Sequence, residues 1–338
     1  MGFWSTVRTT VRRPAEQLVF AALPAEGATP LVPRQGYVRV WLSQMFLQHR
    51  STLLADWVPA AHTRVGITAG GRTTHDYGRV LRPEPGQLTD GVRLNFALTD
   101  LVPYEGGEIE VTAVLFGLQS GNHLDVAVDV LSLVSLLPVP ALPVAAKVSE
   151  SARDLVVRSD GRVHLDLHQT FSADGGGGAV VSPGHLAVVL AAQRDLATAD
   201  LRVVGDRLHV VRDGAVVPLA GHDFMLLRLE CRTVRPDLSI PDADRAWAAA
   251  VHAWSEGDDT AADGYQRAAR AAVLLSPLLC DGDRRRVVAA IAAQWQQLRD
   301  QAQGLTADAV PEGLDALVRR WSPDTTSDPI TPAEAFAM

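Results

Sequence analysis

The stretch Gly91-Val-Arg-Leu-Asn-Phe-Ala-Leu-Thr99 alternates large apolar side chains with small or polar ones. Every second residue of a strand points to the same face of its sheet, so this period of two predicts a strand with one buried face. After a loop with Pro103, residues 108–118 form a run that is rich in β-branched residues and apolar on both faces. Such a run is typical of a strand at the centre of a sheet.

The period changes from two to that of a helix after residue 121. Apolar side chains cover most of a helical wheel over residues 122–137, and Asp125 and Asp129 begin one narrow polar stripe. Prolines at positions 138, 140 and 143 stop this helix, because proline cannot donate a backbone hydrogen bond. We therefore expect residues 121–153 to form an apolar helical hairpin that is buried against the sheet.

The same hairpin allows a second interpretation, in which it enters a membrane. A membrane-spanning helix needs about 20 apolar residues, and residues 130–146 contain three prolines. A permanent transmembrane helix is therefore not expected. Release of the hairpin after a trigger stays open as an alternative. Either arrangement would bury Leu131, Val134 and Leu137.

Strand patterns on both sides of this hairpin predict two β regions. Residues 36–48, 62–69 and 72–81 have the period of strands and place an antiparallel β-sandwich-like domain in residues 1–120. Residues 154–236 contain a second series of short strand patterns separated by turn signals, which is typical of a small sheet. Whether the two β regions pack as one body stays open.

The last part of the chain has helical periods, which begin at Pro241, Thr260, Asp283 and about Pro311. We expect a helical bundle over residues 237–322 and a flexible tail over residues 323–338. The expected fold class is α+β, with an antiparallel β-sandwich-like domain, a buried helical hairpin, a second small β-sheet region and a C-terminal helical bundle.

The composition of the 338 residues narrows the class of protein. A hydrophobic content of 47% is enough for sizeable cores. A formal net charge of −8 argues against a dedicated nucleic-acid-binding protein, because phosphate neutralisation needs a surplus of lysine and arginine. Lys147 is the single lysine, and the abundance of alanine and valine indicates a GC-rich, bacterial genome. Two cysteines, Cys231 and Cys280, are too few for a disulfide framework, so a cytoplasmic protein is expected.

A candidate metal site lies in His164-Leu-Asp166-Leu-His168. On a strand the three polar side chains share one face, and two imidazoles with a carboxylate form part of a ligand set for zinc or another divalent ion. The apolar residues between them explain the same alternation without a metal, the polar triplet then being the solvated side. Since no separate motif supplies further ligands, we expect no cofactor.

A candidate anion or partner contact lies in Arg284-Arg285-Arg286, at the start of an expected helix. The helix dipole favours anions at this end, which makes three adjacent cations unusual there. They would hold a phosphate or an acidic partner, and the alternative is pairing with Asp281 and Asp283.

No recognisable nucleophile arrangement is present, and no catalytic residue is assigned. Aromatic residues of the kind enriched at protein contacts occur at Tyr37, Trp41, Trp247 and Trp254, with core packing as the alternative. We therefore expect a soluble cytoplasmic interaction or scaffold protein that binds a protein partner. The first alternative is a membrane-active effector that releases residues 122–148. The second is a metal-dependent hydrolase that uses His164, Asp166 and His168.

Overall fold

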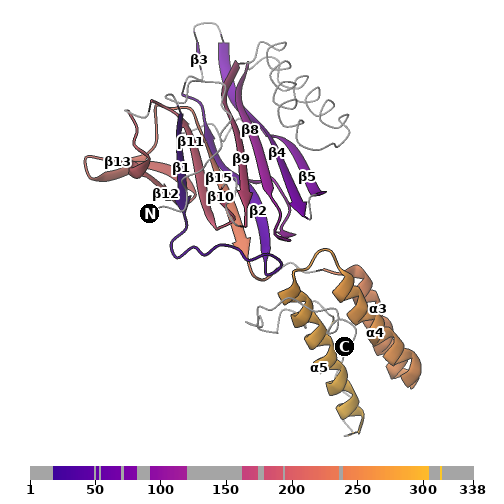
Figure 1. Ribbon diagram of the computed structural model, residues 1–338. Coiled ribbons are helices and arrows are strands. Elements are labelled where there is room, and N and C mark those ends of the chain that lie inside the picture. Colours follow the sequence, from indigo (N-terminus) through magenta and orange to yellow (C-terminus); the bar gives the residue numbers. More distant parts are fainter. Residues whose placement is uncertain are drawn as a thin grey trace. The chain divides into compact units, whose positions relative to one another are not determined.

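The protein is described by a computed structural model that covers residues 18–48, 51–52, 55–69, 72–81, 92–119, 162–173, 179–192, 195–235, 239–303 and 313. Within these residues it is an α+β structure with several antiparallel sheets and three α-helices (Figure 1). The chain divides into two compact units. One contains Met1–Leu31, Arg39–Asp100 and Gly106–Cys231, and the other contains Val32–Val38, Leu101–Glu105 and Arg232–Met338.

The first six-stranded sheet joins strands that are far apart in the sequence. Its order is β1 (Leu18–Pro24), β11 (Gly184–Leu190), β15 (Phe224–Arg232), β2 (Tyr37–Phe46) and β6 (Val92–Ala97), with β7 (Val102–Pro103) paired to β2. The pairs β1–β11, β11–β15 and β2–β6 are antiparallel. The strand predicted from the opening stretch is β6, at one edge of this sheet.

The second six-stranded sheet is built around a central strand that the sequence predicts. Its order is β10 (Ala179–Val180), β9 (Arg162–Ser172), β8 (Ile109–Gln119), β4 (Ala55–Ala69) and β3 (Ser51–Thr52), with β5 (Arg72–Leu81) paired to β4. β8 pairs antiparallel with both β4 and β9, whereas the short β10 is parallel to β9. Both faces of β8 are buried at Val114, Leu115 and Phe116, which confirms the central position predicted for residues 108–118.

The two β regions of the sequence contribute to the same sheets. β1 of the first region pairs with β11 of the second, and β8 of the first pairs with β9 of the second. The sequence predicts a separate small sheet in residues 154–236, but only β12 (Leu201–Val204), β13 (Arg207–Arg212) and β14 (Ala215–Pro218) form one. The difference arises because a hydrophobic period marks the face of a strand but does not identify its neighbour.

The three-stranded sheet β12–β14 is connected by two tight hairpin turns. Both central residues of each turn have positive φ: 57° and 60° for Gly205-Asp206, and 51° and 79° for Asp213-Gly214. Hairpin turns with positive φ at both positions match the right-handed twist of the strands they join. Apolar residues of β12 and β13, including Leu201 and Leu208, pack in one cluster with residues of β11 and β15.

Three helices follow in the second unit: α3 (Pro241–Ser255), α4 (Asp259–Leu275) and α5 (Asp281–Gln303). Pro241 occupies the first turn of α3, where a missing N–H costs nothing. Asp258 caps α4 by accepting a hydrogen bond from the Ala261 N–H. Helix starts predicted at 241, 260 and 283 are thus confirmed to within two residues.

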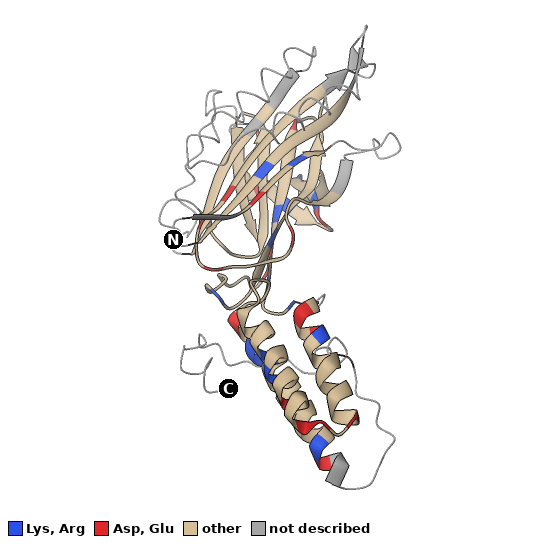
Figure 2. Ribbon diagram, turned by 90° about the vertical axis from the view of Figure 1, so that its right-hand side faces the viewer, with Lys and Arg blue, Asp and Glu red and all other residues tan. Residues whose placement is uncertain are grey.

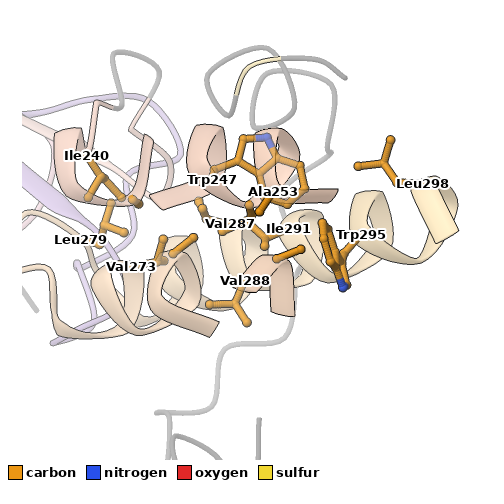
Figure 3. Packing of buried hydrophobic residues seen from close by; sticks show 14 residues of the cluster. Ile240, Trp247, Ala253, Val273, Leu279, Val287, Val288, Ile291, Trp295 and Leu298 are labelled. Carbon is orange, nitrogen blue, oxygen red and sulfur yellow. The ribbon is translucent and has the colours of Figure 1, made fainter. Parts of the chain in front are cut away.

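The three helices share one hydrophobic cluster, drawn in Figure 3. The rings of Trp247 on α3 and Trp295 on α5 meet edge to face, with 6.1 Å between their centroids. Val273 of α4 and Ile291 of α5 are also buried in this cluster. No helix within the described residues has both the length and the hydropathy that a membrane crossing requires.

Several predicted features lie outside the described residues. These are the helical hairpin of residues 121–153, with Leu131, Val134 and Leu137, the helix expected from about Pro311, and the tail of residues 323–338.

Replacing Gly107 by alanine is predicted to destabilise the second sheet. A Cβ at this position would lie 1.6 Å from the Thr68 carbonyl oxygen. The backbone of β4 would have to move, although the Thr68 N–H is bonded to the Glu108 carbonyl at 2.8 Å. We expect Gly107→Ala to lower the free energy of unfolding by about 1–3 kcal/mol, measured by urea denaturation.

Gly66 provides the matched control, because it lies in β4 of the same sheet and a Cβ there meets nothing within 4 Å. Gly66→Ala is expected to change stability by less than about 0.5 kcal/mol. Equal stabilities for the two variants would contradict the close approach of Gly107 to β4.

Candidate functional site

The candidate metal residues His164, Asp166 and His168 occupy alternate positions of β9, as predicted. The structure describes the side chain of His168 only. Its Nε2 lies 3.4 Å from Glu110 Oε1, and its Nδ1 lies 3.3 Å from Thr112 Oγ1. Asp166 stands opposite Val114 of β8, one step along the strand from the pair of His168 and Thr112.

A second ion pair extends this polar row onto β4 and β5. Arg64 stands opposite Thr112, and it donates two hydrogen bonds to the Asp76 carboxylate, at 2.9 and 2.5 Å. The hydrogen bonds to Asp76 raise the pKa of Arg64 further. Glu110 and Asp76 thus each have a basic partner. Among the described side chains, no group of three His, Cys, Asp or Glu is placed to hold a metal ion, so the metal site stays a prediction.

His62 lies next to this row but is enclosed. It is two residues before Arg64 on β4, it is 1% exposed, and neither ring nitrogen has a hydrogen-bond partner among the described residues. Burial, with a smaller effect of the Arg64 charge, lowers the pKa of His62 to about 4. His62 is therefore neutral at pH 7 and is not available as a general acid there.

The arginines of the candidate anion site begin α5, and their carboxylate partners are close by. Arg284 donates to Asp281 Oδ1 at 2.8 Å, and Arg286 Nε donates to Asp283 Oδ1 at 3.0 Å. Arg286 and both aspartates are buried, whereas Arg284 and Arg285 are half-buried. The ion pairs considered as the alternative are thus present, and binding of an external anion stays a prediction.

The same aspartates tie α5 to the start of β2. Tyr37 donates its hydroxyl hydrogen to Asp283 Oδ2 at 2.6 Å and accepts a hydrogen bond from the Cys280 N–H at 3.1 Å. Arg34 contacts Asp281 Oδ2 at 3.0 Å. Burial, together with the charge of Asp283, raises the pKa of Tyr37 above its usual range, so the hydroxyl stays protonated. The network positions a helix and contains no reactive group at neutral pH.

Most of the aromatic residues considered as contact surfaces lie in the core. Tyr37 and Trp247 are buried, and Trp254 packs against the helical cluster. Trp41 is half-buried between the guanidinium groups of Arg39 and Arg228, at 5.4 and 4.7 Å from its ring centroid. Its Nε1 donates to Glu230 Oε2 at 2.7 Å. Side-chain type alone did not separate these cases, because aromatics suit both cores and contacts.

Neither cysteine is an activated nucleophile. Burial and the neighbouring Glu230 raise the pKa of the Cys231 thiol to about 12, and burial raises the pKa of the Cys280 thiol. Both thiols stay protonated at neutral pH, whereas the thiolate is the reactive form.

A surface that sequence reasoning missed lies on the sheet β12–β14. One face of this sheet packs in the apolar cluster with β11 and β15. The strand registers place seven residues on the opposite face, which we call the basic sheet face: Arg202, Val204, Arg207, His209, Val211, Val216 and Pro218. The sequence of these strands does alternate with a period of two. It did not indicate a distinct outer face, because valines as well as arginines occupy the outer positions.

The basic sheet face combines exposed apolar groups with unpaired cations. Val204 is 52% exposed and Val216 is 51% exposed. Ion pairs with carboxylates are formed elsewhere in the chain by Arg34, Arg39, Arg64, Arg228, Arg245, Arg284, Arg286 and Arg299. Neither Arg202 nor Arg207 has a carboxylate partner among the described residues. Acidic and basic residues are otherwise interspersed over strands and helices (Figure 2).

Comparison of the chain with protein-family models, curated proteins and solved structures finds no significant match. Function therefore has to be inferred from the geometry of the described residues.

Replacing Tyr37 by phenylalanine is predicted to weaken the second unit. The change leaves the buried Cys280 N–H without its acceptor and removes one donor from Asp283. We expect Tyr37→Phe to lower the free energy of unfolding by about 1–3 kcal/mol. Tyr265 on α4 is exposed, so Tyr265→Phe in the same unit is the control and should have almost no effect. Equal melting temperatures for both variants would show that the hydroxyl of Tyr37 is dispensable.

His62 is predicted to make the protein acid-sensitive. The pKa of His62 is about 4 in the folded chain, against an ordinary value of 6.5, so the unfolded chain binds the proton first as the pH falls. Stability from the neutral ring is complete above pH 6.5 and declines towards pH 4, by up to about 3 kcal/mol. His62→Leu should remove this part of the pH dependence, measured by urea unfolding at pH 7 and 4.5.

His75 supplies the control for this measurement, because it is half-buried on β5 of the same sheet. His75→Leu should keep the pH dependence of the unaltered protein. The same acid sensitivity in His62→Leu as in the unaltered protein would contradict an enclosed, neutral His62.

Proposed function

We propose that the protein is an interaction or scaffold protein that binds another protein. The observation that carries this proposal is the basic sheet face, which holds the exposed Val204 and Val216 together with Arg202 and Arg207. Apolar residues that neighbour arginine are the composition of protein contacts, in which arginine is enriched over lysine. Exposed apolar groups gathered on one surface mark interaction sites more often than isolated ones do.

The face is held on a firm support, as a binding surface requires. Asp206, in the turn between β12 and β13, lies 3.2 Å from His185 Nε2 and 3.0 Å from Arg228 NH1. The Leu208 N–H donates to Gln44 Oε1 at 2.9 Å. These contacts of Asp206 and Leu208 connect the three-stranded sheet to the first six-stranded sheet. A surface that is already fixed loses little conformational entropy when a partner binds.

The finer architecture and the location belong to the same proposal. We propose that the two six-stranded sheets pack as a β-sandwich and that α3, α4 and α5 form a bundle. Support for the sandwich comes from a small pocket that is lined by Val40 and Leu227 of the first sheet and by Phe171 of the second.

We place the protein in the cytoplasm, because Cys231 and Cys280 are free thiols, as in reducing compartments.

Two alternatives stay predictions, because they depend on parts that the structure does not describe. A membrane-active effector depends on residues 122–148, and a metal-dependent hydrolase depends on the side chains of His164 and Asp166. Liposome leakage after limited proteolysis tests the first. Elemental analysis of protein purified without an affinity tag tests the second.

The interaction function predicts a partner that copurifies with the chain and leaves when the basic sheet face is altered. The double variant Val204→Asp, Val216→Asp adds two charges where an apolar contact is expected. We expect its yield of copurified partner from the native cell to fall at least about tenfold, measured by quantitative mass spectrometry, since a buried unpaired charge costs several kcal/mol.

Leu275→Asp is the comparison variant, because Leu275 is 82% exposed at the end of α4 in the other unit. It should retain the partner. Loss of the partner from Leu275→Asp alone would move the binding site to the helices, and absence of any specific partner from the unaltered chain would contradict the interaction function.

A further inference from the structure

We infer that the basic sheet face binds an extended segment of a partner protein with the pattern acidic-x-acidic-x-apolar, read in either chain direction. The inference rests on the proposed function and specifies the partner chemistry. It follows from the order in which the seven residues of the face are arranged across and along the three strands.

The strand registers sort the face into three rows. Val204 stands opposite Arg207, Arg202 stands opposite His209, and Val211 stands opposite Val216. Pro218 completes the row of His209. One outer row thus holds Val204 with Arg207, and the middle row holds Arg202 with His209 and Pro218. The other outer row holds only Val211 and Val216, so positive charge lies in two adjacent rows and the third row is apolar.

The spacing of residues along a β-strand determines which residues of an extended ligand lie over each row. Residues on one face of a strand are about 6.7 Å apart, so the first and third rows are separated by about 13 Å. An extended peptide that runs along β13 places residues i, i+2 and i+4 over the three rows. Residue i then meets Arg207, residue i+2 meets Arg202 and His209, and residue i+4 meets Val211 and Val216.

The arginines determine the sign of the two ligand residues that face them. Arg202 NH1 donates to the Ala199 and Leu201 carbonyl groups, at 2.6 and 2.7 Å, which holds the guanidinium group in place. A carboxylate would give these guanidinium groups charge-assisted hydrogen bonds, which are stronger than neutral ones. Asp206 and Asp213 lie in the hairpin turns, and Asp200 lies in the short 3-10 helix before β12. Asp206 is engaged by His185 and Arg228.

Two other occupants fit the face less well. A second copy related by a two-fold axis would bring the same arginines against Arg202 and Arg207, and like charges repel. A lipid surface would be held by few charges, each worth about 1 kcal/mol, and the face carries no aromatic residue to enter the membrane interface. A protein segment that contains both acidic and apolar residues complements the arginines and also covers the valines.

Site-specific photo-crosslinking in the native cell tests this inference with the full chain. A small diazirine amino acid replaces Val216, and a second strain carries it at Leu275 as a comparison. We expect the Val216 adduct to map, by mass spectrometry, to a partner segment with two acidic residues two positions apart and an apolar residue two positions beyond one of them. Arg202→Glu with Arg207→Glu should lower the adduct yield at least about tenfold, whereas lysine at both positions should retain most of it.

The remaining outcomes separate this inference from the interaction function. An adduct to lipid, to a second copy of this chain or to a segment without an acidic residue would overturn the inference, as would a yield that ignores the charge reversal. Adducts at Leu275 without any at Val216 would overturn it and leave the interaction function standing. No adduct at either position would count against both. Circular dichroism spectra of the charge-reversed chain verify that it is folded.

Discussion

The pairing of β8 with β4 and β9 is the constraint on which the first unit depends. Along β8, strands from the two β regions of the sequence meet over a long register, from Ile109 to Gly117 on the side of β9. Because both of its edges are paired and both of its faces are buried, β8 has no freedom to shift by one residue without exposing a whole set of apolar side chains. The close approach of Gly107 to Thr68 fixes the point at which this pairing begins.

The sequence predicts where strands and helices lie better than it predicts which strands pair with one another. Strand and helix positions follow from local periods, and residues 72–81 have the bounds that the pattern predicts. The neighbours do not follow, since β1 pairs with β11 across about half of the chain. A local hydrophobic period gives no information about pairing between distant strands. For this reason the second β region was expected to be a sheet of its own.

The candidate sites show the same limit at the level of side chains. His164, Asp166 and His168 do alternate on one strand, but the partners of His168 are Glu110 and Thr112 of the neighbouring strand. Asp281 and Asp283 were visible as neighbours of three arginines, yet Tyr37 is more than 240 positions away and bonds to Asp283. Polar residues in this fold mostly find their partners across elements, which a single sequence does not reveal.

Arg202 and Arg207 differ from these side chains, because they have no carboxylate partner among the described residues. Cations in the two units pair with carboxylates even where they are partly exposed, as Arg64 does with Asp76 and Arg228 with Asp206. Several described arginines thus pair with a carboxylate, although one exposed pair adds little stability. Arg202 and Arg207 stand on a sheet that is anchored through Asp206 and Gln44, so their positions are set by contacts on the opposite side. Fixed cations beside exposed valines cost the folded chain little in isolation, and their charge becomes most effective when a partner excludes water from the face.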